Sequence, residues 1–214
     1  MESYKTVTET YVSEITEKRS RFIATLAHAA DENTAMQTIN KIKSENREAR
    51  HNVYAYVINN NSLTRYSDDG EPHSTAGKPV LDVINGKGLR DVVLVVTRYF
   101  GGILLGTGGL VRAYSAAAQR VTDSAEFCVM CRCTEIETEC AYSDYEKLLR
   151  VFEKFNCHIF PCEFTHNVKM RLYIQTAESE TLTETLDTEF FGKITLKFGK
   201  ELFFPLKIQN FKSN

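Results

Sequence analysis

Three carboxylates crowd into a five-residue turn, DDGEP, which begins at Asp68. Asp68, Asp69 and Glu71 surround Gly70 and are followed by Pro72. Carboxylates that converge in this way can hold a divalent cation or accept protons, although their spacing is not that of an EF-hand loop. The alternative is a tight turn with no chemistry, which the composition favours.

A glycine-rich stretch between Arg98 and Arg112 is the second candidate site. It follows an apolar, β-branched run typical of a buried strand and precedes apolar residues at helical spacing. Amides that face the start of a helix favour an anion, and the two arginines add positive charge. We therefore expect a phosphate-binding loop. The alternative is that residues 103–105 dock the loop on the core and that its glycines only relieve crowding; they are Gly101, Gly102, Gly106, Gly108 and Gly109.

Two familiar nucleotide-binding motifs do not fit this loop. Thr107 and Gly108 stand where a P-loop requires Lys and Ser or Thr. Val111 takes the place of the third glycine of a dinucleotide fingerprint, and the connection from strand to helix is too long for that fold. The loop therefore belongs to neither motif.

His51 stands at the entrance of a strand predicted over His51–Ile58. A histidine in this position is more often bonded to a neighbouring backbone group than catalytic. We keep both interpretations open.

The six cysteines predict reduced thiols rather than a zinc site. Cys128 and Cys131 form a C-x-x-C, but the surrounding stretch has the pattern of a strand, which sends residues three apart to opposite faces. No second chelating pair follows in the sequence.

Composition places the chain among ordinary globular proteins. It has 214 residues, of which 43% are hydrophobic and 25% charged, and its formal net charge is −2. No segment resembles a leader or a membrane span, so we expect a cytoplasmic protein without a membrane partner. Because the whole chain does not attract nucleic acid electrostatically, any phosphate binding must be local.

The first part of the chain predicts strands and helices in alternation. We expect two strands between Thr6 and Ala27, a helix capped by Asp31, a turn at 59–61 and a second helix from Pro79 to Gly86. A buried strand at 91–97 and a helix containing Leu110, Tyr114, Ala117 and Val121 complete this part.

The remainder predicts a ferredoxin-like βαββαβ domain. Strands are expected at 134–140, 158–164, 168–174 and around 194–198, with one helix opened by a Ser143–Glu146 capping box and a second containing Leu182 and Leu186. The chain is thus an α+β protein with two expected domains, 1–132 and 133–214.

One face of that second sheet is expected to remain uncovered and to carry charges. Alternation assigns to it Glu135, Glu137, Glu139, Lys169, Arg171, Tyr173, Lys193 and Lys197. Opposite charges on adjacent strands stabilise one another, so pairing within the sheet is the expected arrangement. No aromatic RNA-binding motif is present.

Three separated blocks resemble the signature of the IMPACT-like, or YigZ-like, family. They are DDGEP at 68–72, TAGKP at 75–79 and RYFGGILLGTGGLVRAY at 98–114. The stretch from Ala49 to Tyr56 is similar to the family's ATHN-x-YAY segment, with Arg50 in place of threonine. The resemblance spans the full length. It implies that the N-terminal domain is similar to domain IV of the translocating elongation factor and to the second domain of a small-subunit ribosomal protein.

The resemblance also implies where a ligand would bind and what it would be. The expected ligand-binding residues are His51, Asp68, Asp69, Glu71, Thr75, Lys78, Arg98, Tyr99, Gly101, Gly102, Gly106, Gly108, Gly109, Arg112 and Tyr114. Eukaryotic members of the family bind a regulator of the translation-controlling general-control kinase. The implied partners are thus a ribosome, RNA or a translation-regulator protein, and a nucleotide is also compatible with the loop.

Two functions remain at this point, and we favour the first. The first is a translation-linked regulatory binding protein that uses the glycine loop face, and the second is a metal-assisted hydrolase or phosphotransferase that uses the DDGEP carboxylates. The sequence shows no nucleophile beside a base, and the carboxylates crowd together more like a turn than an acid–base pair. We assign no catalytic residue, metal ligand or cofactor.

Overall fold

The computed structural model describes residues 3–58 and 62–206 of the chain and has a mixed α+β fold. The chain divides into two compact units between Cys128 and Val129, within one long strand. The expected boundary at 132/133 lies a few residues further along the same strand. The turn predicted at 59–61 lies outside the described residues.

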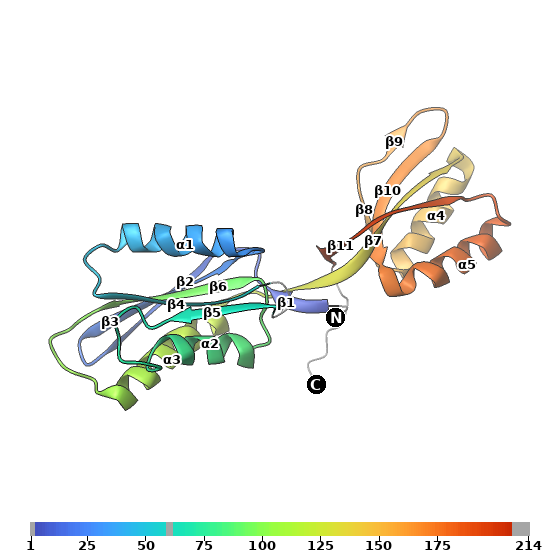
Figure 1. Cartoon of the computed structure of the whole chain (residues 1–214). Coiled ribbons are helices and arrows are strands. Elements are labelled where there is room, and N and C mark those ends of the chain that lie inside the picture. Colours follow the sequence, from blue (N-terminus) through green and yellow to red (C-terminus); the bar gives the residue numbers. More distant parts are fainter. Residues whose placement is uncertain (1–2, 59–61, 207–214) are drawn as a thin grey trace. The chain divides into compact units, whose positions relative to one another are not determined.

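The first unit is a five-stranded antiparallel sheet with helices on both faces (Figure 1). The strand order is β2-β3-β6-β4-β5. Helix α1 covers one face, and α2 and α3 cover the other. Strand β1 (Ser3–Thr6) comes first in the chain and belongs to the other sheet. The elements of this unit are β2 (Tyr11–Glu17), β3 (Ser20–His28), α1 (Glu32–Glu45), β4 (His51–Ile58), β5 (Leu63–Ser67), α2 (Gly77–Gly86), β6 (Val92–Tyr99) and α3 (Thr107–Ser124).

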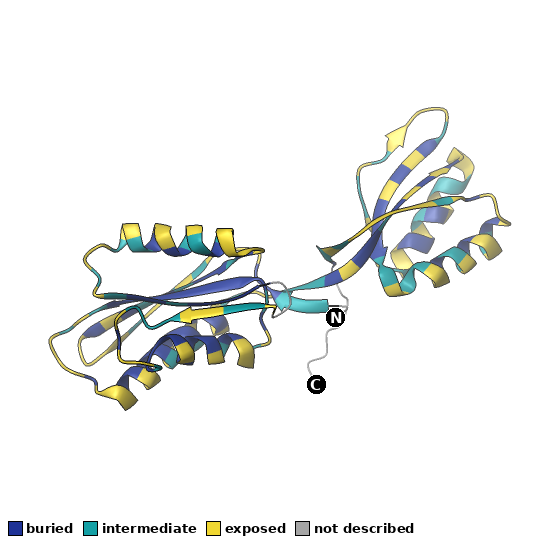
Figure 2. Cartoon of the chain, viewed as in Figure 1, coloured by how far each residue is buried: buried dark blue, intermediate teal, exposed yellow. Residues whose placement is uncertain are grey.

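Strand β6 is the centre of this sheet and is apolar on both sides, as its sequence predicted. Val92, Leu94 and Val96 pack into the core beneath α2 and α3. Val93 and Val95 pack into a separate core beneath α1. Figure 2 shows the buried residues along the central strands and on the helix faces that meet them. Two covered faces explain why the strand shows no polar alternation.

The helix starts confirm one prediction and correct another. Asp31 caps α1, and its carboxylate accepts the Thr34 backbone N–H at 2.7 Å. Helix α2 begins at Gly77, so the start predicted at Pro79 was wrong. The carboxylate of Asp68 accepts the amides of Ala76 and Gly77 at 3.1 and 2.8 Å and thus caps this helix from the DDGEP turn. A helix-start rule that considers only adjacent residues misses such a cap.

The second unit has the predicted ferredoxin-like order. Its strands β11-β7-β10-β8 lie side by side in this order, β9 also pairs with β10, and β1 also pairs with β7 in the same six-stranded sheet. Helices α4 and α5 cover one face of the sheet. The elements are β7 (Cys128–Cys140), α4 (Tyr142–Lys154), β8 (His158–Ile159), β9 (Glu163–Phe164), β10 (Val168–Gln175), the short 3₁₀ helix η1 (Thr176–Glu178), α5 (Ser179–Phe190) and β11 (Leu196–Pro205).

Two local predictions in this unit were wrong. The strand expected over 158–164 is split into β8 and β9, because Pro161 has no N–H to donate to a ladder. Ser143 is the second residue of α4 rather than its cap; the helix starts after Ala141, and no side chain caps it.

The cysteines are all free thiols, and several are buried. Burial raises the pKa of Cys133 to about 12, with a smaller contribution from neighbouring Cys131. Burial also raises the pKa of Cys157 to about 12. These thiols remain protonated at neutral pH.

Among the described residues, no helix is both long and apolar enough to cross a membrane.

We predict that residues 129–214 fold on their own. Their core, which includes Ile136, Leu148, Phe152 and Leu172, is made entirely within this unit. The isolated fragment should therefore give one cooperative thermal transition under reducing conditions, measured by circular dichroism. A broad melt without a baseline would contradict separate folding units.

Candidate functional site

The first acid of the DDGEP turn, Asp68, stabilises the backbone of the TAGKP segment. Its carboxylate accepts the Ser74 amide at 2.8 Å in addition to the two amides that open α2. Gly77 is required in this arrangement, because a Cβ there would lie 2.8 Å from the carbonyl group of Ser67. The first two family blocks thus form one folded segment.

Asp69 points away from Asp68 and is held by other partners. Its carboxylate accepts from Lys43 Nζ and from the backbone N–H of Asn52, both at 2.7 Å. Its carbonyl oxygen lies 2.8 Å from His51 Nδ1. Asp69 therefore joins the turn to α1 and to the start of β4.

Glu71 lies at the centre of a buried polar network. Arg98 Nη1 on β6 donates to Glu71 Oε1 at 2.6 Å, and the Tyr114 hydroxyl on α3 donates to the same oxygen at 2.8 Å. Glu71 is 9% exposed, Arg98 5% and Tyr114 0%. Burial, and then the negative charge of Glu71, raises the pKa of Tyr114, so its phenol stays a donor.

His51 and two phenylalanines complete this network. His51 Nε2 lies 3.8 Å from Glu71 Oε1. The guanidinium carbon of Arg98 lies 5.4 Å from the ring centre of Phe22 and 5.6 Å from that of Phe100. These contacts replace solvent around the arginine. Arg98 is therefore engaged by the protein itself and is not presented at the surface.

The arrangement of the three acids does not make a metal cage. Asp68 binds backbone amides, Asp69 binds Lys43, and Glu71 binds Arg98. In residues 3–58 and 62–206, no group of three or more acids, histidines and cysteines is placed to hold a metal ion. The carboxylates act here as acceptors that join segments of the fold.

The glycine loop is tied to the β2–β3 turn at Gly101. A Cβ at this position would lie 2.1 Å from the carbonyl carbon of Arg19, and the Gly101 amide donates to Ser20 Oγ at 3.2 Å. Only glycine permits this backbone contact. Further along, Gly106 has a φ of +69° and precedes α3, whose first turn receives no side-chain cap.

The loop is only partly packed on the core. Leu105 is buried, but Leu104 is 82% exposed and Ile103 41%. Phe100, at the start of the loop, is 39% exposed. The interpretation that residues 103–105 dock together therefore holds for Leu105 alone.

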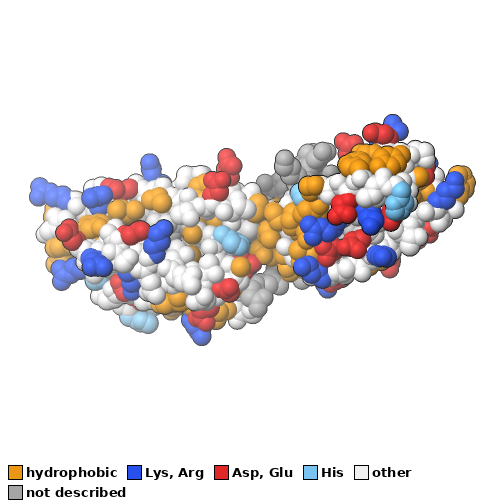
Figure 3. All heavy atoms as spheres, turned by 90° about the horizontal axis from the view of Figure 1, so that it is seen from above, with side chains coloured by type: hydrophobic (Ala, Val, Ile, Leu, Met, Phe, Trp, Pro, Cys, Tyr) orange, Lys and Arg blue, Asp and Glu red, His pale blue; other side chains and the backbone are white. Residues whose placement is uncertain are grey.

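Exposed cations surround this loop. Arg50 lies 5.8 Å from the ring centre of Phe100, and the Lys18–Arg19 turn contacts Gly101. Arg112 is exposed on the first turns of α3, and in the described part of the chain it forms no ion pair. Figure 3 shows Lys and Arg side chains on the first unit, on the left of the view, interspersed with acidic and hydrophobic side chains.

The remaining expected site residues have separate structural environments. Thr75 is buried, and its hydroxyl donates to the Pro72 carbonyl at 2.6 Å. The Tyr99 hydroxyl donates to Asn46 Oδ1 at 2.8 Å. Lys78 is exposed and pairs with Asp82 on α2. Of the other glycines, Gly102 has a φ of +84° and open space around it, Gly108 lies beside Arg112, and Gly109 lies against Leu105.

Sequence inspection missed several members of the site. Lys43 comes from α1 and lies in no distinctive motif, whereas Asn52 comes from β4 and lies in the segment similar to ATHN-x-YAY, although it was not among the expected site residues. Asn52 had one signal, because it is a polar residue in an otherwise apolar strand; it accepts from Thr97 Oγ1 at 2.8 Å. Phe100 and Arg50 do lie in the family blocks, and only their contacts indicate their role.

Comparison with known proteins establishes the family. Residues 18–122 match the Impact N-terminal domain, and residues 138–192 match a domain of unknown function, DUF1949. The chain is 32% identical to the IMPACT family member YvyE of Bacillus subtilis strain 168 over 99% of this chain and 98% of that protein. The chain belongs to the IMPACT family.

Other IMPACT family relatives agree with this assignment and with the resemblance found in the sequence blocks. Protein IMPACT-A of Xenopus tropicalis is 40% identical over 43% of this chain and 30% of that protein. A solved structure described as a crystal structure of a hypothetical protein is 30% identical, with a TM-score of 0.62, over 92% of this chain and 97% of that one.

The two hydrogen bonds that Glu71 accepts in the buried network should contribute differently to the free energy of unfolding. Glu71→Gln leaves the buried Arg98 without a counter-ion and should lower the free energy of unfolding by about 3–5 kcal/mol. Tyr114→Phe removes one hydrogen bond to a charged group and should lower it by about 1.5–3 kcal/mol. Urea unfolding measures both. Equal losses of unfolding free energy in the two variants would show that the ion pair contributes no more to stability than the Tyr114 hydrogen bond does.

Proposed function

We propose that this protein is a translation-linked regulatory binding protein and that the glycine loop face of its first unit contacts RNA phosphate. Membership of the IMPACT family supports the translation-related role, because the family resemblance implies it. The proposal places the protein in the cytoplasm, in contact with a ribosome or free RNA, and requires no catalytic group.

The exposed Arg112 beside the uncapped start of α3 is the observation that carries the proposal. A Cβ on Gly108 would lie 3.8 Å from Arg112 Nη1, so glycine and guanidinium border the same space. The first amides of α3 receive no side-chain cap. A phosphate at this position would meet backbone N–H groups, the helix dipole and a charged side chain together.

The neighbouring cations extend this positive surface, although acids are also present. Lys18, Arg19 and Arg50 are exposed on the same end of the sheet, and Glu17 and Glu48 are exposed nearby in sequence. Phe100 adds a partly exposed ring beside Arg50. Cations that follow the nucleic-acid backbone, together with an aromatic ring on which a base can stack, are typical of proteins that bind single-stranded RNA.

The metal-assisted alternative has less support from the contacts. Each DDGEP carboxylate already accepts donors of the protein, and Arg98 is paired with Glu71. To hold a cation, the acids would have to break the cap of α2 or expose a buried arginine.

Binding to labelled single-stranded RNA tests the proposal. Arg112→Ala should weaken binding and lower the slope of log K against log salt by about 0.7 for each lost phosphate contact. Gly108→Val should abolish binding, because a branched side chain fills the space beside Arg112. Fluorescence anisotropy over a salt series measures both effects.

Two controls make the result interpretable. Gly108 is not among the glycines with positive φ, so its replacement strains the backbone less than at Gly106, and circular dichroism must show the variant folded. Arg120→Ala removes an exposed cation about two turns further along α3 and should leave binding unchanged. Affinity insensitive to both salt and Arg112→Ala would rule out phosphate recognition.

The exposed Leu104 favours a second candidate, docking of a translation-regulator protein on the same loop. In a co-purification with the full chain, Leu104→Asp would then abolish binding of that protein, whereas Arg112→Ala would leave its binding intact. RNA binding predicts the reverse sensitivity, so the two functions separate on this pair of variants.

A further inference from the structure

The face of the second sheet that α4 and α5 do not cover carries alternating charges from strand to strand. Tyr173, expected to be uncovered on this face, is instead buried, because its ring packs against Phe160 and Phe204. Lys197 on β11 stands opposite Glu137 on β7, and Glu137 stands opposite Arg171 on β10. In the next row, Glu139 on β7 stands opposite Lys169 on β10, and Lys169 stands opposite Glu163 on β9. Across β11, β7, β10 and β9 the signs are therefore positive, negative, positive and negative.

In the described ranges, none of these directly opposed residues forms an ion pair with the residue opposite it, and the pairing expected within the sheet is seen diagonally, between Arg171 and Glu135. Arg171 Nη1 lies 3.6 Å from Glu135 Oε1, and Glu139 accepts from Asn167 at 2.8 Å. Lys169 and Lys197 have no ion pair in the described ranges. The charged groups of these strands are thus available to an external partner.

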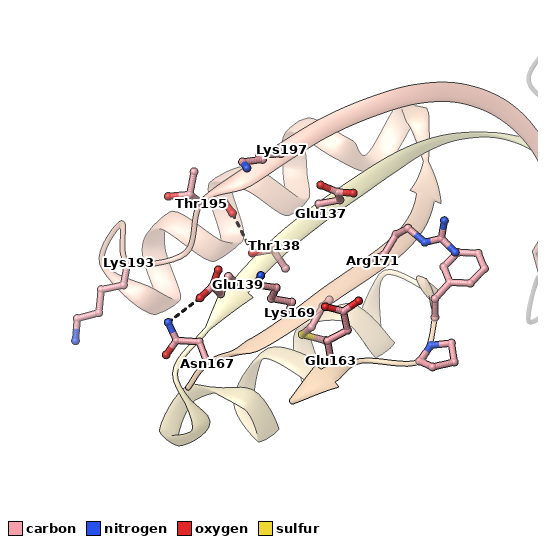
Figure 4. A pocket seen from close by; sticks show the side chains of 13 residues that line it. Glu137, Thr138, Glu139, Glu163, Asn167, Lys169, Arg171, Lys193, Thr195 and Lys197 are labelled. Atoms are coloured by element: carbon pink, nitrogen blue, oxygen red, sulfur yellow. Dashed lines mark hydrogen bonds between the residues drawn. The ribbon is translucent and has the colours of Figure 1, made fainter. Parts of the chain in front are cut away.

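The charges line a groove of about 790 Å³. Figure 4 shows Glu137, Lys169, Glu163 and Lys197 along neighbouring strands of this groove. Phe160 and Pro161 form one wall, and the guanidinium carbon of Arg171 lies 4.2 Å from the ring centre of Phe160. The face is hollowed and mixed in charge rather than flat and apolar.

A partner of one charge sign does not fit this face. A polyanion that contacts the lysines of β10 and β11 would bring its phosphates over the carboxylates of β7, which lie one strand away, or about 4.8 Å. A polycation meets the same difficulty with the lysines. The matching surface must itself alternate in sign at the spacing of β-strands.

We propose that the occupant is the same face of a second copy of this chain. A two-fold axis parallel to the strands and above the border of β7 and β10 reverses the strand order. It places β7 opposite the partner's β10 and keeps each row at its own level along the strands. Glu137 then faces the partner's Arg171, and Glu139 faces the partner's Lys169, so the two central strands oppose charges of opposite sign. An isologous interface requires such self-complementarity.

Two charge-reversed variants of the full chain test this interface. The acid-reversed variant is Glu137→Lys with Glu139→Lys, and the base-reversed variant is Lys169→Glu with Arg171→Glu. All four side chains are exposed, so both variants should melt like the wild type. Glu180→Lys with Glu184→Lys is the matched control, because it changes exposed charge on α5, outside the groove, by the same amount as the acid-reversed variant.

Sedimentation velocity over a concentration series at low salt is the measurement. The wild type and the control should form the same dimer, and each reversed variant should associate at least about tenfold more weakly with itself. An equimolar mixture of the two reversed variants should restore a dimer, since their faces complement one another. Salt should weaken the wild-type dimer as the Debye length falls from about 10 Å at 0.1 M to about 3 Å at 1 M.

Several outcomes would overturn the proposal. One is a wild type that stays monomeric at every concentration, and another is a dimer that neither reversal affects. A mixture of reversed variants that stays monomeric would exclude the strand-against-strand arrangement. A monomeric wild type that binds single-stranded RNA, with binding lost in the base-reversed variant, would assign the face to a polyanion instead.

Discussion

The ion pair between Glu71 and Arg98 is the interaction on which the first unit depends. Each charge is buried, and each would carry a large desolvation cost without the other. Their pairing therefore requires the DDGEP turn to lie against β6, and the Tyr114 hydroxyl adds α3 to the same contact. Three segments that are far apart in the sequence are positioned by one oxygen atom of Glu71.

In this arrangement, the charged residues of the family blocks fall into a set that faces inward and a set that faces solvent. The acids face inward, where they cap α2, join α1 to β4 and neutralise Arg98. Arg112 faces solvent, together with the cations of the β2–β3 turn and Arg50. The DDGEP motif, which had the most candidate catalytic groups in the sequence, thus holds the fold together, and the proposed binding surface is the loop that it supports.

The two units differ in whether helices cover both faces of the sheet or only one. Helices cover both faces of the first sheet, so β6 is apolar throughout and the available surface lies at the end of the strands. Helices α4 and α5 cover only one face of the second sheet. Part of its other face is a small buried cluster around Cys133 and Tyr173, and the rest is exposed, which allows charged residues to stand in register on adjacent strands. The external surfaces follow from this difference in layers.

The sequence by itself determined the elements whose signals are local. The apolar run of β6, the Asp31 cap and the βαββαβ order depend on neighbouring residues, and the three blocks identified the family. Only the tertiary structure decided which charges are free. Asp68 caps a helix that starts nine residues later, Arg98 is buried whereas Arg112 is exposed, and Glu137 faces Arg171 without bonding to it. Partners of a side chain are set by long-range contacts and by burial, which periodicity and spacing do not encode.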